Sequence, residues 1–184
     1  MRREQLEHLL RAASSIAGVT DLVVIGSQAI LGTYPEWELP REATMSVEAD
    51  LAVDAELARL EVAVDETELA DMIDGAIGEG SRFHETFGYY AQGVETSTAI
   101  LVAGWRERLV PLICETARPI AVGWCLERHD LWVAKAAAAR EKDLEFCGAL
   151  ARSELVDRDT CLERIAALSE LDRRKAEAVA SAAF

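Results

Sequence analysis

The amino-acid sequence predicts an α+β fold, in which a small, mostly antiparallel or mixed sheet is flanked by helices and followed by a helical C-terminal tail. The expected order of elements, a helix, a strand, a helix, several strands and then helices, is typical of this class. A hydrophobic content of 51% suffices to bury a core, and 184 residues suit a single compact unit. Within that unit we expect an α/β core over residues 1–126 and a helical part over residues 127–184 packed on it.

The first quarter of the chain contains the signals of a helix, a buried strand, a helical turn and a loop. Residues 2–17 place leucine, isoleucine and alanine at helical spacing, and residues 21–26, DLVVIG, indicate a short buried strand. Ser27 is a favourable N-cap residue, so SQAILG is expected to form one or two helical turns. Two prolines within residues 33–43 predict a loop.

The middle of the chain combines strand and helix patterns. Residues 45–53, MSVEADLAV, alternate between two kinds of side chain with the period of a half-buried strand. Residues 55–64 fit either a helix or a strand. Residues 65–79 have the spacing of an amphipathic helix, and the alternation within residues 87–95 and 98–104 predicts a β-hairpin.

The last part of the chain is expected to be mainly helical. Residues 107–114 indicate one more strand. Residues 128–150 are rich in alanine and repeat apolar residues at helical spacing, which predicts one long helix. Residues 156–168 and 170–183 supply one or two further helices.

Charge and cysteine usage restrict the partners and the compartment. The chain has 19 Lys and Arg against 33 Asp and Glu, a net charge of −14, which argues against broad nucleic-acid binding, although a local basic patch could hold a phosphate or one RNA. No apolar run approaches the roughly 20 residues that span a bilayer. The four cysteines have no paired CxxC spacing and are expected to be reduced, mostly buried thiols in a cytoplasmic protein.

Two acids stand on one face of the strand expected over residues 45–53. Glu48 and Asp50 are two residues apart, so their side chains point to the same side at a separation of roughly 7 Å. Like charges on one face repel each other, and a divalent cation such as Mg²⁺ would remove that repulsion, because it prefers hard oxygen ligands. The alternative is an acidic edge that faces solvent.

Two other features favour anion binding. The turn at Gly26 and Ser27 joins a strand to a helix, and it would present backbone N–H groups and a hydroxyl to a phosphate. Lys135 and Lys142 fall on or beside the apolar face of the long helix, and lysines are seldom buried without a partner. We expect Lys135 to face an anion, whereas Lys142 could instead reach solvent; Asp143 could orient a lysine or face solvent.

These motifs resemble a known family. VVIGSQAILG followed by SVEADL looks like the nucleotidyltransferase superfold of the polymerase-beta type, in which a Gly-Ser or Gly-Gly turn precedes a strand with a DxD or ExD pair. Later segments, including GWRERLVPL and LVDRD, resemble small bacterial nucleotidyltransferase-like proteins related to the AbiEii/MenT-type toxins. The motif of a Lys followed by an Arg-x-Lys-Asp cluster is matched by Lys135, Arg140, Lys142 and Asp143.

The resemblance implies a reaction and a set of site residues. A nucleoside monophosphate would be transferred from an NTP to tRNA, to a protein hydroxyl or to a small molecule, with Mg²⁺ or Mn²⁺ as the cofactor. By analogy alone the protein would be a toxin with an antitoxin partner. The implied roles are phosphate contact for Gly26 and Ser27, metal binding for Glu48 and Asp50, charge neutralisation for Lys135, and a place in the nucleotide site for Arg140, Lys142 and Asp143.

The chain also departs from the pattern of the related toxins, which show an Arg-x-Thr-x-Asp-x-Asp run. Thr44 stands in the arginine position, Ser46 in the threonine position and Glu48 in the first aspartate position. The third carboxylate of the superfold has two candidates, Glu85 and Glu95. These departures leave a second hypothesis, a catalytically degenerate nucleotidyltransferase that acts as a nucleotide-binding or protein-interaction module.

Overall fold

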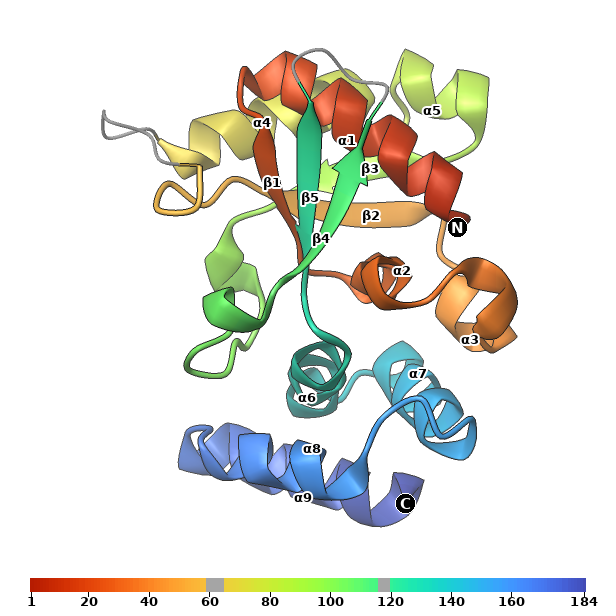
Figure 1. The fold of residues 1–184 in the computed structure, drawn as a ribbon, viewed down its shortest axis with the longest axis vertical. Helices are drawn as coiled ribbons and strands as arrows, with labels where there is room; N and C mark the ends of the chain where they lie inside the picture. The colour runs from red at the N-terminus through yellow and green to blue at the C-terminus, as the bar shows by residue number, and fades with distance from the viewer. Residues whose placement is uncertain (59–64, 116–119) are drawn as a thin grey trace.

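A computed structural model describes residues 1–58, 65–115 and 120–184, and it confirms the α+β class with a mixed five-stranded sheet (Figure 1). The strands follow the spatial order β3-β2-β1-β5-β4. The pairs β1–β5 and β2–β3 are parallel, whereas β1–β2 and β4–β5 are antiparallel. The strands are β1 (Asp21–Val24), β2 (Glu48–Ala52), β3 (Tyr90–Gly93), β4 (Val110–Cys114) and β5 (Ala121–Cys125).

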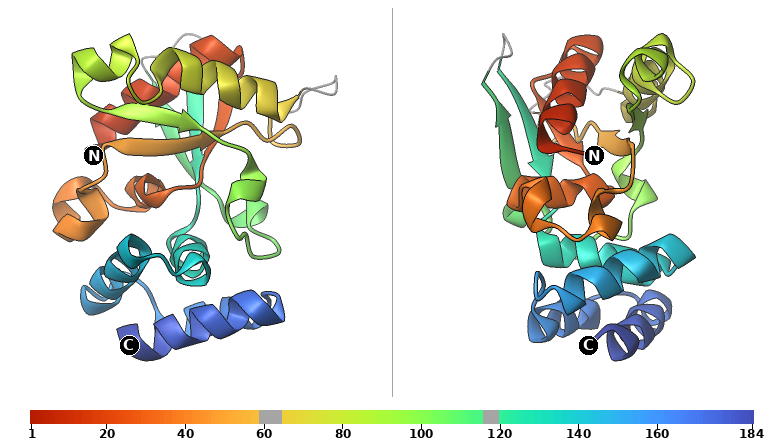
Figure 2. Two further views of the ribbon diagram at one scale, coloured as in Figure 1. Left: turned by 180° about the vertical axis from the view of Figure 1, so that it is seen from behind. Right: turned by 90° about the vertical axis from the view of Figure 1, so that its right-hand side faces the viewer.

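Helices cover one face of the sheet and one end of it (Figures 1 and 2). The first and fourth helices pack against each other and against strands, and the last four form a stack below the point where β1 and β5 end. The α-helices are α1 (Arg3–Ala17), α2 (Ile30–Thr33), α3 (Arg41–Thr44), α4 (Glu66–Ile77), α5 (Arg82–Phe87), α6 (Arg128–Ala138), α7 (Glu141–Arg152), α8 (Arg158–Ala166) and α9 (Glu170–Ala183). The short 3-10 helices are η1 (Ser27–Ala29), η2 (Glu36–Glu38), η3 (Thr96–Thr98) and η4 (Arg106–Arg108).

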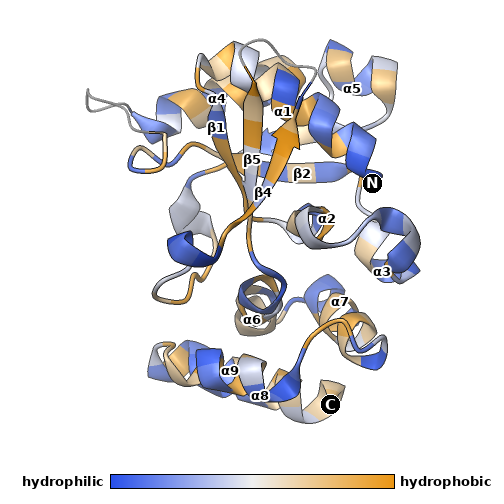
Figure 3. Ribbon diagram, in the orientation of Figure 1, coloured by the Kyte–Doolittle hydropathy of each residue, from blue (hydrophilic) through white to orange (hydrophobic). Residues whose placement is uncertain are grey.

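The core lies between α1 and the sheet. One strand of this sheet, β5, has no clear strand pattern in its sequence. Leu10 of α1 is fully buried, and a Cβ on Gly123 would lie 2.4 Å from its Cδ1 atom. Gly123 therefore lets the helix approach the centre of β5 closely. A glycine inside a strand weakens the strand signal, which explains why residues 121–125 carry no clear prediction. Apolar residues dominate β4 beside it, whereas polar positions interrupt β2 (Figure 3).

Two local predictions, a hairpin and a loop, were wrong. The hairpin over residues 87–95 and 98–104 does not form: β3 pairs in parallel with β2, and η3 then turns the chain away. Residues 99–104 contain no strand, and the first two of them, Ala99 and Ile100, line the cleft described below. The loop expected over residues 33–43 includes η2 and most of α3. Of the ambiguous residues 55–64, the segment 59–64 lies outside the described residues.

The helix expected over residues 128–150 is divided into α6 and α7 at Ala139. This residue has φ = 52°, in the left-handed region that a non-glycine residue seldom adopts. Its N–H still bonds to the carbonyl of Lys135, which closes α6, and Arg140 then becomes the N-cap residue of α7. Helical periodicity continues through the break, so the sequence pattern cannot detect it.

A buried ionic network joins the core to the C-terminal helices. Asp130, 1% exposed on α6, accepts a 2.7 Å hydrogen bond from Nε of Arg108 in η4. Arg164 of α8 contacts Asp130 at 2.9 Å and also pairs with Glu127, the N-cap residue of α6. His129 Nδ1 lies 2.7 Å from Glu127 Oε1. Removing one member would leave buried charges unpaired, so this network resists separation of the two parts.

The sequence predicts buried, reduced cysteines and no membrane-spanning segment. All four cysteines are free and buried, and burial raises the pKa of each of these thiols. Within the described segments, no helix has both the length and the apolar character needed to cross a bilayer.

Because of this network, we expect the free energy of unfolding to fall in acid. Burial by itself would raise the pKa of Glu127, but His129 and Arg164 outweigh it and lower the pKa from 4.5 to about 2. A depressed native pKa contributes stability above the unfolded pKa, and that contribution is lost as pH falls from about 5 to 2. We expect Glu127→Gln to lower the free energy of unfolding at pH 7 by about 1–3 kcal/mol and to flatten its dependence on pH in that window.

Urea unfolding at several pH values measures this effect. Glu163→Gln, which changes an exposed glutamate of α8, is the matched control and should retain the wild-type slope. Equal slopes for the two variants would contradict the role given to Glu127.

Candidate functional site

The turn after β1 is built around a contact between Gly26 and Asp50. A Cβ on Gly26 would lie 1.5 Å from Oδ2 of Asp50, so the carboxylate occupies space that any other residue would fill. Ser27 follows as the first residue of η1, and its hydroxyl does not cap that helix as expected. The residue type at position 26 therefore determines where the Asp50 carboxylate lies.

Glu48 and Asp50 are half-buried neighbours on β2 rather than a fully exposed acidic edge. Burial raises the pKa of Asp50 most, and Glu48 raises it further through its charge and a side-chain hydrogen bond. On the parallel strand β3, the hydroxyl of Tyr90 donates to Oε2 of Glu48 at 3.3 Å. Burial, followed by the charge of Glu48, raises the pKa of Tyr90 to about 12, so this phenol stays protonated at neutral pH. No ion pair of Glu48 or Asp50 is formed within the part of the chain that the structure describes, although the charge of Lys135 partly offsets the rise in the pKa of Asp50.

Opposite them, a buried carboxylate orients two cations. Asp143 of α7 is 1% exposed, and Nζ of Lys135 lies 3.2 Å from its Oδ1 atom. Nε of Arg140 donates to Oδ2 of Asp143 at 2.7 Å. Burial would raise the pKa of Asp143, but Arg140 and Lys135 outweigh it and lower the pKa below its usual value. Lys142 is exposed, which agrees with the alternative in which its side chain reaches solvent.

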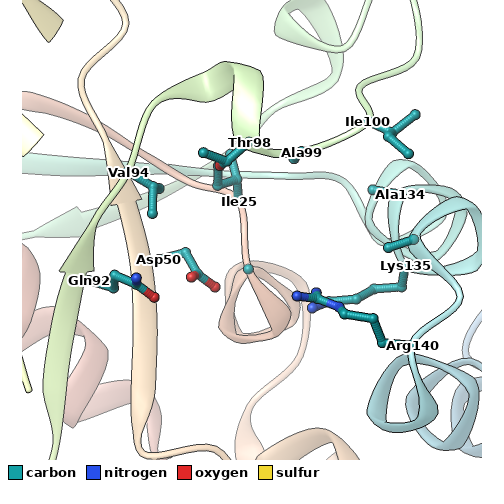
Figure 4. Close-up of a pocket in the computed structure, with 12 residues that line it drawn as sticks. Ile25, Asp50, Gln92, Val94, Thr98, Ala99, Ile100, Ala134, Lys135 and Arg140 are labelled. Carbon is teal, nitrogen blue, oxygen red and sulfur yellow. The ribbon is translucent and has the colours of Figure 1, made fainter. Parts of the chain in front are cut away.

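A cleft of about 390 Å³ separates Asp50 from the cations (Figure 4). Asp50 and Gln92 lie on one side of it, and Lys135 and Arg140 reach in from the other. Glu48, the other predicted metal ligand, stands beside Asp50 on β2 but lines neither this cleft nor the second hollow described below. The negative charges of Asp50 and Glu48 raise the pKa of Arg140, in addition to the larger effect of Asp143. The apolar part of the wall includes Ile25, Val94, Ile100 and Ala134.

A second hollow of about 280 Å³ lies on the other side of Lys135, which lines both. It brings together Ser27 and Ser46 from the core and Lys142 from α7. The structure therefore distributes the predicted nucleotide-binding residues over two adjoining spaces. The cleft is lined by Gly26, Asp50, Lys135 and Arg140, and the second hollow by Ser27, Lys135, Lys142 and Asp143.

Neither candidate for a third carboxylate lies in these spaces. Glu85 is exposed on α5, and Glu95 accepts a 2.8 Å hydrogen bond from the hydroxyl of Thr67. The register pairs Asp50 with Gln92 of β3, which lines the cleft beside it. Gln92, and Thr98 of the segment after β3, could not be predicted as site residues from the sequence, because their positions depend on the pairing of β3 with β2.

The oxygen-bearing side chains on and beside the Asp50 side of the cleft are suitable ligands for a divalent cation. The charge of Glu48 makes ionisation of Asp50 less favourable, and the side-chain amide oxygen of Gln92 is a further hard donor nearby. Across residues 1–58, 65–115 and 120–184, no three histidine, cysteine, aspartate or glutamate side chains are grouped to hold a metal ion by themselves. Mg²⁺ commonly binds through one or two carboxylates and completes its ligands with substrate phosphates, so this donor set is compatible with it.

Comparisons with known proteins point to one family. A family model described as "Nucleotidyltransferase of unknown function (DUF6036)" matches residues 4–180, nearly the whole chain. No curated protein and no solved structure matches the chain.

The contact at Gly26 predicts a strong coupling between two positions. We expect Gly26→Ala to lower the free energy of unfolding by about 1–3 kcal/mol, because the new Cβ overlaps the Asp50 carboxylate. Asp50→Ala in the same background should recover most of this loss, since the nearest remaining atom, the Asp50 Cβ, would lie at 3.0 Å. Urea unfolding of the two single variants and the double variant gives the coupling energy.

Gly75→Ala is the matched control for this experiment. Gly75 lies within α4, and nothing lies within 4 Å of an added Cβ. Alanine is the better helix former, so this variant should be neutral or slightly stabilised. A coupling energy near zero between positions 26 and 50 would refute the contact.

Proposed function

Because the chain belongs to this nucleotidyltransferase family, we propose that its cleft transfers a nucleoside monophosphate from an NTP to an acceptor in a metal-dependent reaction. The single observation that carries the proposal is the opposition of charges across the cleft. Asp50 lies on one side, beside Glu48, and Lys135 and Arg140 reach in from the other (Figure 4). A metal bound by acids and a polyphosphate bound by cations need this arrangement.

Glu48 and Asp50 would hold the metal. A bound Mg²⁺ or Mn²⁺ would offset the charge of the phosphates and make the α-phosphorus more open to attack. The chain itself contributes the positions of the carboxylates: Gly26 leaves room for Asp50, and Tyr90 donates a hydrogen bond to Glu48. Gln92 offers a neutral oxygen next to Asp50 on the paired strand.

Lys135 and Arg140 would neutralise the triphosphate. Both are held by Asp143, so their ammonium and guanidinium groups are oriented before the nucleotide arrives. Such preorganised charge needs no rearrangement during the reaction, which is the main source of catalysis in phosphoryl transfer. Ser27 and Lys142, around the second hollow, extend this polar region and would accept the end of the phosphate chain.

The nucleoside would lie along the apolar part of the cleft. Ile25, Val94 and Ile100 supply surface for the base and the ribose. Gln92 and Thr98 carry the polar groups there that can form hydrogen bonds with a base. In this reaction the oxygen of an acceptor hydroxyl forms a bond to the α-phosphorus, and the hydroxyl proton passes to solvent. The bond between the α-phosphorus and the bridging oxygen breaks, and pyrophosphate leaves with its electrons.

The resemblance of the sequence to AbiEii/MenT-type toxins leaves three classes of acceptor: tRNA, a protein hydroxyl or a small molecule. It also extends the proposal to a toxin that an antitoxin protein neutralises. A net charge of −14 means that an RNA acceptor would have to be bound locally, at the cationic side of the cleft.

One observation favours a second candidate function, a nucleotide-binding module without turnover. The position paired with Asp50 carries Gln92, an amide that cannot accept a proton as a carboxylate would. A module of this kind would bind NTP and metal through the same residues. Turnover distinguishes the two functions, because binding alone transfers no label.

Incorporation of label tests the reaction. Wild-type protein with Mg²⁺ and each α-³²P-labelled NTP should label a component of total tRNA or of a cell extract. Glu48→Gln and Asp50→Asn should reduce labelling by about 100-fold or more, because each removes a charge that the metal requires. Glu85→Gln, which changes an exposed acid of α5, should retain wild-type labelling.

Two results would count against an enzyme. Absence of labelling in all combinations would favour the binding module, provided that NTP still binds. Equal labelling by wild type and both acid variants would exclude Glu48 and Asp50 from the reaction.

Nucleotide affinity tests the cationic side of the cleft separately. We expect Lys135→Gln to weaken binding of a non-hydrolysable NTP with Mg²⁺ by about 10–100-fold, or about 1.4–2.8 kcal/mol. Lys142→Gln should weaken it by only about 3-fold, since this exposed side chain is more strongly hydrated. Isothermal titration calorimetry measures both, with Lys175→Gln on α9 as the control that should leave affinity unchanged. Identical affinities for Lys135→Gln and the control would contradict this role.

A further inference from the structure

We propose that Tyr90 is a positioning residue that holds the Glu48 carboxylate ready to bind the metal. The inference rests on the proposed function, but it concerns a residue outside the Gly-Ser, acid-pair and Lys-Arg-Lys-Asp motifs. The hydroxyl of Tyr90 donates to Oε2 of Glu48 at 3.3 Å. The two residues are paired in register on β3 and β2, so their side chains leave the sheet on the same face.

Glu48 needs such a partner more than Asp50 does. The aspartate has a short side chain, and its carboxylate is confined against Gly26. The glutamate has one more rotatable bond, and ordering a free glutamate side chain costs free energy each time a metal binds. A hydrogen bond made before binding reduces that cost.

Tyr90 is itself held in place by the start of α5. The ring of His84 packs on the ring of Tyr90, with centroids 4.6 Å apart. Nδ1 of His84 accepts a hydrogen bond from the N–H of Gly80 at 3.1 Å, and Ser81 caps the helix by accepting from the N–H of His84. This series of contacts fixes the phenol through side chains that never reach the cleft.

The hydrogen bond leaves the carboxylate able to bind a cation. A carboxylate has two oxygens with about four acceptor positions, and the Tyr90 hydroxyl occupies one of them. Partners that orient a metal ligand typically change metal affinity by about 10–100-fold when they are removed. Tyr90→Phe removes the hydroxyl and keeps the ring that packs on His84, so it isolates the hydrogen bond.

The neighbouring residue provides a matched control. Tyr89 precedes Tyr90 in the chain, and its hydroxyl lies 2.8 Å from Nδ1 of His8 on α1, on the opposite face of the sheet. Tyr89→Phe therefore removes the same atom from the same strand region without touching the acids. A general effect of losing a phenol hydroxyl would appear in both variants.

Binding of Mn²⁺ to the protein without nucleotide, measured by electron paramagnetic resonance, is the main test. We expect wild type and Tyr89→Phe to bind one Mn²⁺ with equal affinity, and Tyr90→Phe to bind it about 10-fold more weakly. His84→Ala, which removes the supporting ring, should give a smaller loss of about 3-fold and serves if Tyr90→Phe folds poorly. In the labelling reaction, Tyr90→Phe should raise the Mg²⁺ concentration for half-maximal rate by a similar factor while the rate at saturating Mg²⁺ stays within about 2-fold.

The outcomes separate this inference from the proposed function. If wild type binds Mn²⁺ and Glu48→Gln abolishes that binding, but Tyr90→Phe equals Tyr89→Phe, the inference is overturned and the metal site remains. It is also overturned if Tyr90→Phe weakens binding equally in the Glu48→Gln background, because the effect would then not act through Glu48. If wild type binds no Mn²⁺ without nucleotide, the inference is overturned, whereas the metal dependence of the proposed function is decided separately by the labelling reaction with and without Mg²⁺.

Discussion

The buried carboxylate of Asp143 is the interaction on which the geometry of the site depends. It is 1% exposed and is contacted by Lys135 at 3.2 Å and by Arg140 at 2.7 Å. These cations come from opposite sides of a helix break at Ala139, a residue held in the left-handed region at φ = 52°. Such a conformation persists only where the surroundings impose it, and the two charged contacts on either side supply that constraint.

Charges of opposite sign are kept apart on the two sides of the cleft, as the proposed binding of a metal and a polyphosphate requires. Asp50 and Glu48 stay on β2, where Gly26 and Tyr90 confine them, and the cations stay on the helical side. Among the described residues, Asp50 forms no direct ion pair across the cleft, and Lys135 and Arg140 pair with Asp143 instead. Burial and then the charge of Glu48 raise the pKa of Asp50, and the charge of Lys135 only partly offsets this rise. Although the chain has a net charge of −14, Lys135 and Arg140 form a small positive region on one side of the cleft.

The position of the cleft also ties its function to the packing of the two parts of the chain. Its acidic wall belongs to the sheet, and its cationic wall belongs to the first two of the C-terminal helices (Figure 1). The contact of Arg108 and Arg164 with Asp130 keeps those parts in register. A displacement of about 1 Å between them would alter the distance between acids and cations, and such misplacement strongly affects group transfer. Structural charges far from the cleft are therefore expected to influence it.

Periodicity and local motifs determined the class of fold, most helices, the strand that carries Glu48 and Asp50, and the Gly26-Ser27 turn. These features depend on residues close in the sequence, so their signals are complete in a short window. The tertiary structure alone decided that β3 pairs with β2 rather than forming a hairpin, which brought Gln92 beside Asp50 and Tyr90 beside Glu48. It also decided the break at Ala139 and the strand around Gly123, where α1 lies close above the sheet. Strand partners and helix breaks are chosen by contacts between distant segments, and a local pattern of apolar residues is the same whichever partner is chosen.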